Sequence, residues 1–186
     1  MSSDLIRWGG LAGVMYVLTD ILSLLAPQQR VFNSFSDYLI EVIFAVAVAG
    51  TLGAIAGLHA LQSGRYGRLG AAGSLLAFIG YALFFVRTAV TTLVGGEAPL
   101  YAVRISIVGA LAVLIGSVLL GAMTLRARVL PWWCGVLLIV GFPLSAASEV
   151  AFSAAGGTVL GIVWGLIGYA LLPLRGTVEE QPSRVS

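Results

Sequence analysis

Six long apolar segments, separated by short polar or glycine- and proline-rich turns, make up most of this chain. They cover residues 8–26, 38–61, 69–93, 101–125, the stretch from the break near Pro131 to 152, and 158–174. A helix needs about 20 apolar residues to cross a hydrocarbon layer, and the sixth segment barely reaches that length. Only helices satisfy their backbone polar groups within one such segment. The pattern therefore predicts an all-α, polytopic integral membrane protein with six transmembrane helices in three helical hairpins.

Composition indicates that lipid, rather than water, surrounds this chain. Apolar residues make up 59% of the sequence, charged residues make up 10%, and the mean hydropathy is +1.03. A soluble domain usually has roughly a quarter of its residues charged. The length predicts one transmembrane domain over residues 1–176. Residues 177–186 are polar and are expected to form a mobile cytoplasmic tail.

The placement of arginine predicts the orientation of the helices. All ten basic residues are arginine. Most of them lie near the two termini or in the second and fourth loops: Arg7, Arg65, Arg68, Arg126, Arg128, Arg175 and Arg184. Cytoplasmic loops carry the excess of basic residues, so we expect both termini in the cytoplasm. The net charge of +2 then reflects topology, and no nucleic-acid partner is expected.

Small residues recur at a spacing of four along several segments, as in Gly157, Gly161 and Gly165. Residues four apart share one face of a helix, and glycines there allow a neighbouring helix to approach closely. One interpretation is packing between helices of one chain. The other is a homodimer interface through these three glycines.

Five ionisable residues interrupt the apolar segments: Asp20, Glu41, Arg87, Arg104 and Glu149. Each charge costs about 2.5–3.5 kcal/mol near the bilayer centre on insertion scales, so the presence of each one needs a structural or functional explanation. The topology predicts all five in the outer half of the membrane. The helix dipole favours Glu41 and Arg87 where they are, but it opposes Asp20, Arg104 and Glu149, which therefore need partners most.

Two interpretations of these charges stay open. In the first, they form buried salt bridges that lock the register of the helices. In the second, they surround a polar pocket that opens outward, with Asp20 at its floor and Arg87, Arg104 and Glu149 in its walls. Four further side chains are expected to line that pocket: Tyr16, Thr88, Thr91 and Thr92.

Residue types that carry common chemistry are scarce. His59 and Cys134 are the only residues of their kinds, so neither a clustered histidine metal site nor an intramolecular disulfide is expected. No cofactor motif is present. The serines of the apolar segments have no histidine in the same leaflet to act as a base. We therefore expect a protein that is not an enzyme, although an acid–base pair of Asp20 and Glu149 stays open.

The leading hypothesis is binding of a lipid head group, a small amphipath or a partner helix through the outer charged cluster. Membrane lipids are then the expected partners. The alternative is a small solute or ion transporter, or a channel subunit, that uses the same charges. A weak internal repeat, with residues 10–13 matching 70–73, favours this alternative because transporters are often built from repeats. Against this alternative, no segment is interrupted except for an expected kink at Pro143, and discontinuous helices are the better indication of a transport site.

Two stretches resemble a known kind of protein. They are residues 57–61 (GLHAL) with 64–70 (GRYGRLG), and residues 130–138 (LPWWCGVLL). They are similar to small six-span membrane proteins of GC-rich bacteria, classed as domains of unknown function. The similarity covers most of the chain, but its motifs are helix ends and packing glycines. The resemblance implies a bacterial inner-membrane location and transfers no catalytic or binding residue.

Overall fold

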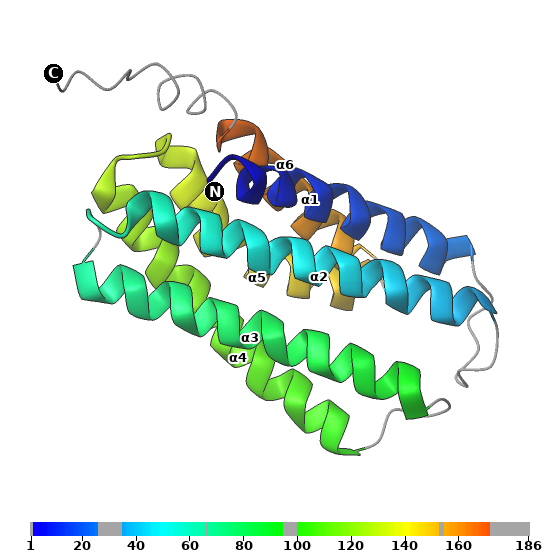
Figure 1. Cartoon of the computed structure of the whole chain (residues 1–186). Helices are drawn as coiled ribbons and strands as arrows, with labels where there is room; N and C mark the ends of the chain where they lie inside the picture. Colours follow the sequence, from blue (N-terminus) through cyan, green and yellow to red (C-terminus); the bar gives the residue numbers. More distant parts are fainter. Residues whose placement is uncertain (1, 26–34, 66, 95–99, 153–154, 172–186) are drawn as a thin grey trace, which may run out of the picture.

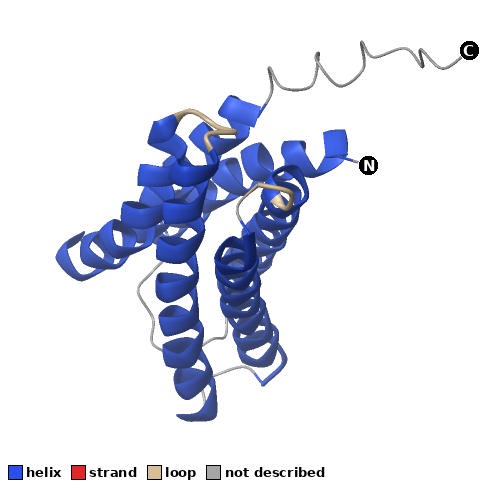
Figure 2. Ribbon diagram, turned by 90° about the vertical axis from the view of Figure 1, so that its left-hand side faces the viewer, coloured by secondary structure: helices blue, strands red, loops and turns tan. Residues whose placement is uncertain are grey.

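A computed structural model describes residues 2–25, 35–65, 67–94, 100–152 and 155–171. Within these ranges the chain forms helices joined by short turns, and no strand is present (Figures 1 and 2). The helices are α1 (Ser2–Leu25), α2 (Phe35–Gln62), α3 (Gly67–Val94), α4 (Leu100–Ala127), α5 (Trp132–Phe152) and α6 (Gly156–Leu171). The predicted tail at 177–186 and the predicted end of the sixth segment lie outside the described residues.

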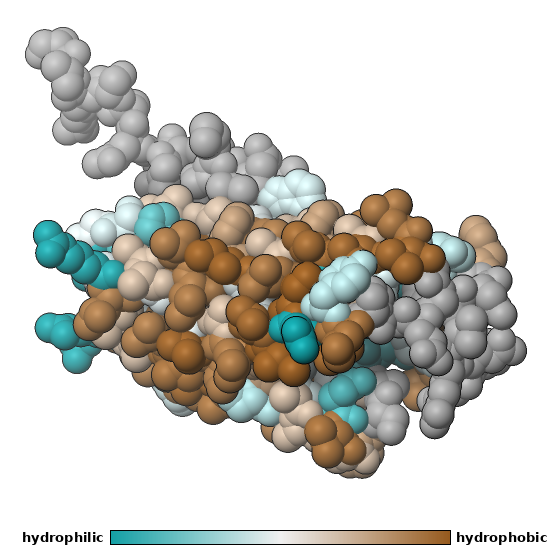
Figure 3. All heavy atoms as spheres, turned by 90° about the horizontal axis from the view of Figure 1, so that it is seen from below, coloured by the Kyte–Doolittle hydropathy of each residue, from teal (hydrophilic) through white to brown (hydrophobic). Residues whose placement is uncertain are grey.

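The predicted all-helical class is confirmed for the described part of the chain. Helices α1 to α5 are long and apolar enough to cross a membrane, whereas α6 has 16 residues. At 1.5 Å per residue, α6 is about 24 Å long, which is less than a typical hydrocarbon layer. A broad apolar band covers much of the face seen from below, with hydrophilic residues at its left-hand end and a few more toward the opposite end (Figure 3). Length and composition therefore indicate a membrane location.

The helices form a ring. Each helix contacts the next one along the chain, and α6 returns to contact α1. The contact between α6 and α1 is more extensive than the contact between α6 and α5. The start of α1 and the end of α6 lie at the same end of the bundle (Figure 1). We call this the proximal end. The opposite end, where α1 finishes and α2 begins, is the distal end.

Close backbone contacts explain why these helices associate. Lipid tails are as apolar as leucine, so association in a membrane depends on close packing and polar contacts rather than on burial. A Cβ atom added to Gly161 of α6 would stand 2.6 Å from the carbonyl oxygen of Gly13 in α1. An added Cβ on Gly121 of α4 would stand equally close, at 2.6 Å, to the carbonyl oxygen of Gly135 in α5. Glycine at such positions therefore sets which helices are neighbours.

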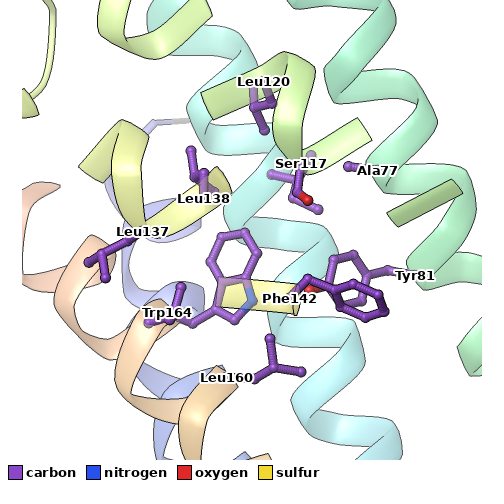
Figure 4. A pocket seen from close by; sticks show the side chains of 11 residues that line it. Ala77, Tyr81, Ser117, Leu120, Leu137, Leu138, Phe142, Leu160 and Trp164 are labelled. Atoms are coloured by element: carbon purple, nitrogen blue, oxygen red, sulfur yellow. The ribbon is translucent and has the colours of Figure 1, made fainter. Parts of the chain in front are cut away.

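An aromatic layer fills the middle of the ring. It consists of Tyr16, Phe44, Tyr81, Phe84, Phe142 and Trp164. The rings of Tyr81 and Trp164 lie edge to face with their centroids 6.1 Å apart, and Phe84 lies 6.5 Å from Phe142. The void left among these rings and the neighbouring apolar side chains has a volume of only about 10 Å³ (Figure 4). That is hardly enough for one water molecule, so the centre of the bundle is closed.

Candidate functional site

A cavity with a volume of about 490 Å³ lies at the distal end of the described structure. Side chains of α1, α2, α3, α5 and α6 line it, and the cavity is open rather than sealed. Its lining includes four of the five charged residues singled out in the sequence: Asp20, Glu41, Arg87 and Glu149. Small-molecule sites typically have volumes of about 300–1,000 Å³. We call this space the distal cavity.

Two of its carboxylates bind the first turn of α6. Asp20 of α1 accepts a hydrogen bond from the backbone N–H of Thr158. Glu149 of α5 accepts one from the N–H of Gly156 at 3.1 Å. The first N–H groups of a helix lack partners within the helix, and its N-terminus carries a partial positive charge of about half a unit. The two anions therefore interact unfavourably with the dipoles of their own helices but favourably with the dipole of α6.

Glycines at the start of α6 make these bonds possible. A Cβ atom added to Gly156 would stand 2.6 Å from Oε2 of Glu149, and one on Gly157 would stand 2.9 Å from Cγ of Asp20. The Ser145 hydroxyl donates to the carbonyl oxygen of Gly156 at 2.8 Å, which ties α5 to the same turn. Asp20 is 8% exposed and is therefore almost wholly enclosed by this arrangement.

The opposite wall carries an ion pair. Nη1 of Arg87 in α3 lies 3.4 Å from Oε1 of Glu41 in α2. The Glu41 side chain is 13% exposed and that of Arg87 is 31% exposed. The second carboxylate oxygen of Glu41 is buried and has no hydrogen-bond partner among the described residues. This pair is thus longer and less completely bonded than the contacts at the start of α6.

The structure places Arg104 apart from the other four charges. It is an exposed residue of α4, a helix that contributes no side chain to the distal cavity. No ion pair of Arg104 occurs within the described ranges. The expectation that Arg104 forms a wall of the pocket is therefore corrected. The physical reason is that α4 packs chiefly on α3 and α5, where it does not reach the space between α1, α2 and α6.

Of the four hydroxyl-bearing side chains that were predicted to line the pocket, the structure places only one there. Tyr16 lines the distal cavity as expected, but Thr88, Thr91 and Thr92 do not. Thr91 and Thr92 instead donate to carbonyl oxygens of their own helix, at 2.7 Å and 2.8 Å. Such bonds to the preceding turn are the usual way to satisfy a threonine in an apolar helix. They leave these two side chains to pack within the bundle.

Aromatic rings close the inner side of the distal cavity. Tyr16, Phe44, Phe84 and Phe142 belong both to the aromatic layer and to the lining of the cavity. Phe142 and Leu160 also border the small central void, which shows that one layer of side chains separates the two spaces (Figure 4). The distal cavity is therefore a blind pocket with charged walls and an apolar floor.

The sequence argument missed the start of α6 as the partner of Asp20 and Glu149. The available signal was the short sixth segment at 158–174, which directly follows two consecutive glycines, Gly156 and Gly157. A short helix that starts inside the layer crossed by its neighbours has N-terminal donors that need partners there. The other part of the signal was that Asp20 and Glu149 have unfavourable positions on their own helices and therefore need donors from another helix.

Comparison of this chain with protein-family models, curated proteins and solved structures finds no match. The distal cavity itself must therefore carry any argument about function. No three His, Cys, Asp or Glu side chains of the described residues come close enough together to hold a metal ion.

The glycine spacing of α6 has an explanation within the chain. Gly157 faces Asp20, and Gly161 packs on the backbone of Gly13. A Cβ atom added to Gly165 would meet nothing within 4 Å. Gly165 borders an apolar groove of about 340 Å³ between α1 and α6. The backbone nitrogen of Gly165 nevertheless lies 2.8 Å from a Cβ atom added to Gly13, so packing between α1 and α6 already involves all three glycines. A homodimer through this face stays a prediction.

Proposed function

We propose that this chain is a six-span protein of the bacterial inner membrane that binds a small amphipathic molecule in the distal cavity. In this proposal both termini are cytoplasmic and the cavity opens outward, as the placement of arginine predicts. The observation that carries it is the blind pocket itself. Four intramembrane charges line a space of about 490 Å³ whose floor is aromatic. A ligand with one polar end and one apolar end matches both surfaces.

Binding is favoured over catalysis by how the acids are used. The carboxylates of Asp20 and Glu149 accept hydrogen bonds from the backbone of α6. A general acid or base needs to exchange its proton with a substrate, whereas these two carboxylates already serve as acceptors for backbone N–H groups. A small amphipath is favoured over an anionic head group, because Arg87 is the one arginine in the lining of the cavity and Arg104 lies outside it.

Blocking the pocket tests the proposal. Ala146 of α5 lines the distal cavity, and Ala146→Trp is expected to fill it. Val150 is one turn away on the same helix, is 89% exposed, and lies outside the lining, so Val150→Trp is the matched control. The purified protein in lipid nanodiscs is titrated with cationic, neutral and anionic amphipaths. At least one should bind saturably to the wild type and to Val150→Trp, but not to Ala146→Trp. Equal binding by all three proteins, or no saturable binding at all, would refute the proposal.

Transport is the second candidate, and one observation favours it. Pro143 lies within α5 beside Phe142, the ring that separates the distal cavity from the central void. Proline removes a backbone hydrogen bond, so the helix is most easily bent at the floor of the pocket. In proteoliposomes, a transporter would exchange a labelled ligand across the bilayer, and Asp20→Asn would abolish that exchange while the protein stays folded. Binding without exchange would leave the first proposal in place.

A further inference from the structure

The formal charges of the distal cavity do not balance. Asp20, Glu41 and Glu149 supply three carboxylates, and Arg87 supplies the single cation of the lining. The start of α6 offsets about half a charge, since that is the effective size of a helix dipole. With these carboxylates ionised, the walls keep more than one unit of negative charge in a space surrounded by apolar helices.

Three of the four neutral polar side chains of the lining add acceptors rather than donors; the fourth, Tyr16, contacts the Thr51 hydroxyl at 3.5 Å. The hydroxyls of Thr19 and Ser23 both donate to carbonyl oxygens of their own helix at 2.8 Å. The Ser145 hydroxyl donates to Gly156. Each of these side chains has therefore used its only proton, and only its oxygen remains available to a ligand. Glu41 adds a buried carboxylate oxygen without a hydrogen-bond partner among the described residues.

An anion would find little in this pocket to bind. Arg87 is already engaged by Glu41, and carboxylates surround the rest of the polar lining. A cation would instead offset charges that are costly in a medium of low dielectric constant. This difference favours a ligand with a positive charge.

The size and floor of the cavity indicate an organic cation rather than a metal ion. Within the described residues, Glu41 lies on the wall opposite Asp20 and Glu149, and the three carboxylates do not form a group able to hold a metal. The volume of about 490 Å³ far exceeds that of one ion, and three phenylalanine rings contribute to the lining. Aromatic rings attract both apolar groups and organic cations.

We propose that the ligand of the distal cavity is an amphipathic organic cation. Its positively charged group lies between the carboxylates of Asp20, Glu41 and Glu149, and its apolar body rests on the aromatic floor. This inference depends on the proposed function, since it names the class of molecule that the same site binds.

Two probes of nearly equal shape and opposite charge test the sign of the ligand. Tetraphenylphosphonium is the cation and tetraphenylborate is the anion. Each is titrated into the full chain in nanodiscs, and binding to empty nanodiscs is subtracted. The phosphonium should bind saturably and at least about tenfold more tightly than the borate, a ratio equivalent to about 1.4 kcal/mol. The Ala146→Trp variant should bind neither probe.

Charge variants identify the groups responsible. Glu149→Gln removes one wall charge and keeps an oxygen for the Gly156 N–H, so it should bind the phosphonium about tenfold more weakly. Asp37→Asn removes a charge at the distal end of α2 but outside the lining, and it should change the affinity less than about twofold. Glu41→Gln provides a second test from the opposite wall, with the same expected direction as Glu149→Gln.

The other possible results distinguish failure of this inference from failure of the proposed function. If both probes bind equally and Ala146→Trp abolishes both, the pocket binds amphipaths but does not select cations, so this inference fails alone. Tighter binding of the borate overturns it in the same way. If neither probe binds saturably, or if Ala146→Trp binds like the wild type, the proposed function fails as well. Equal weakening by Asp37→Asn and Glu149→Gln would show a general surface effect and also overturn the inference.

Discussion

The two walls of the distal cavity hold their carboxylates in different ways. On the wall of α1, α5 and α6, Asp20 and Glu149 bind backbone N–H groups at the start of α6. On the wall of α2 and α3, Glu41 contacts the flexible side chain of Arg87 at 3.4 Å. Backbone donors at a helix end are fixed by the fold, whereas a guanidinium on a long side chain can move.

This difference extends to the helices themselves. Helix α6 packs closely on α1 through glycine, whereas α2 contacts α3 less extensively. Because of the contact between α1 and α6, we expect the wall of α1, α5 and α6 to be the rigid side of the cavity and the wall of α2 and α3 to be the side that can adapt to a ligand. Four predictions test this contrast, and we give them in order of decreasing effect.

The largest effect is expected where the rigid wall is built. Gly161→Ala places a Cβ atom 2.6 Å from the carbonyl oxygen of Gly13, so α6 must move away from α1. We expect a loss of about 2–4 kcal/mol in the free energy of unfolding, measured by titration with a denaturing detergent. Gly165→Ala is the matched control on the same helix, since its added Cβ meets nothing within 4 Å. Equal stability of the two variants would contradict the proposed role of this contact.

A smaller effect is expected at the cap of α6. Asp20→Ala removes the acceptor of the Thr158 N–H and should cost about 2 kcal/mol, whereas Asp20→Asn keeps an acceptor and should cost about 1 kcal/mol. The same detergent titration measures both. If the asparagine variant were as unstable as the alanine variant, the carboxylate charge rather than the hydrogen bond would hold α6.

The adaptable wall should be less sensitive, and its loss should be recoverable. Arg87→Ala leaves the Glu41 carboxylate without its cation and should cost about 1–2 kcal/mol, an estimate reduced for the partial exposure of both side chains. The double variant Arg87→Ala/Glu41→Ala should be less destabilised than the sum of the two single variants. Simple additivity in this double-mutant cycle would show that the pair contributes no coupling.

The smallest effect is expected for the charge outside the cavity. Arg104→Ala should change the free energy of unfolding by less than about 0.5 kcal/mol, because Arg104 is exposed and lies outside the cavity lining. It should also leave binding of tetraphenylphosphonium unchanged. Loss of binding in this variant would place Arg104 in the site, against the observed arrangement.

Much of the fold could be predicted because apolar length and polar interruptions are local properties. The described bounds of α2 to α5 lie within a few residues of the predicted segments, although α1 begins earlier, at Ser2. Four of the five charges do line one cavity. The partners of these charges could not be predicted, because the sequence does not show which helices are neighbours in the ring or which way their side chains face. Buried salt bridges among the five charges were one of the two interpretations, but Glu149 binds a helix end instead of an arginine.

The sequence by itself determined that most of this chain is apolar helix and that formal charge inside it needs partners, because hydrocarbon does not solvate charge. Only the tertiary structure decided which groups are the partners of these charges. The start of the short helix α6 lies against Asp20 and Glu149, Arg87 faces Glu41, and Arg104 stays apart. Those choices depend on which helices lie side by side, and that depends on glycine contacts between segments far apart in the chain.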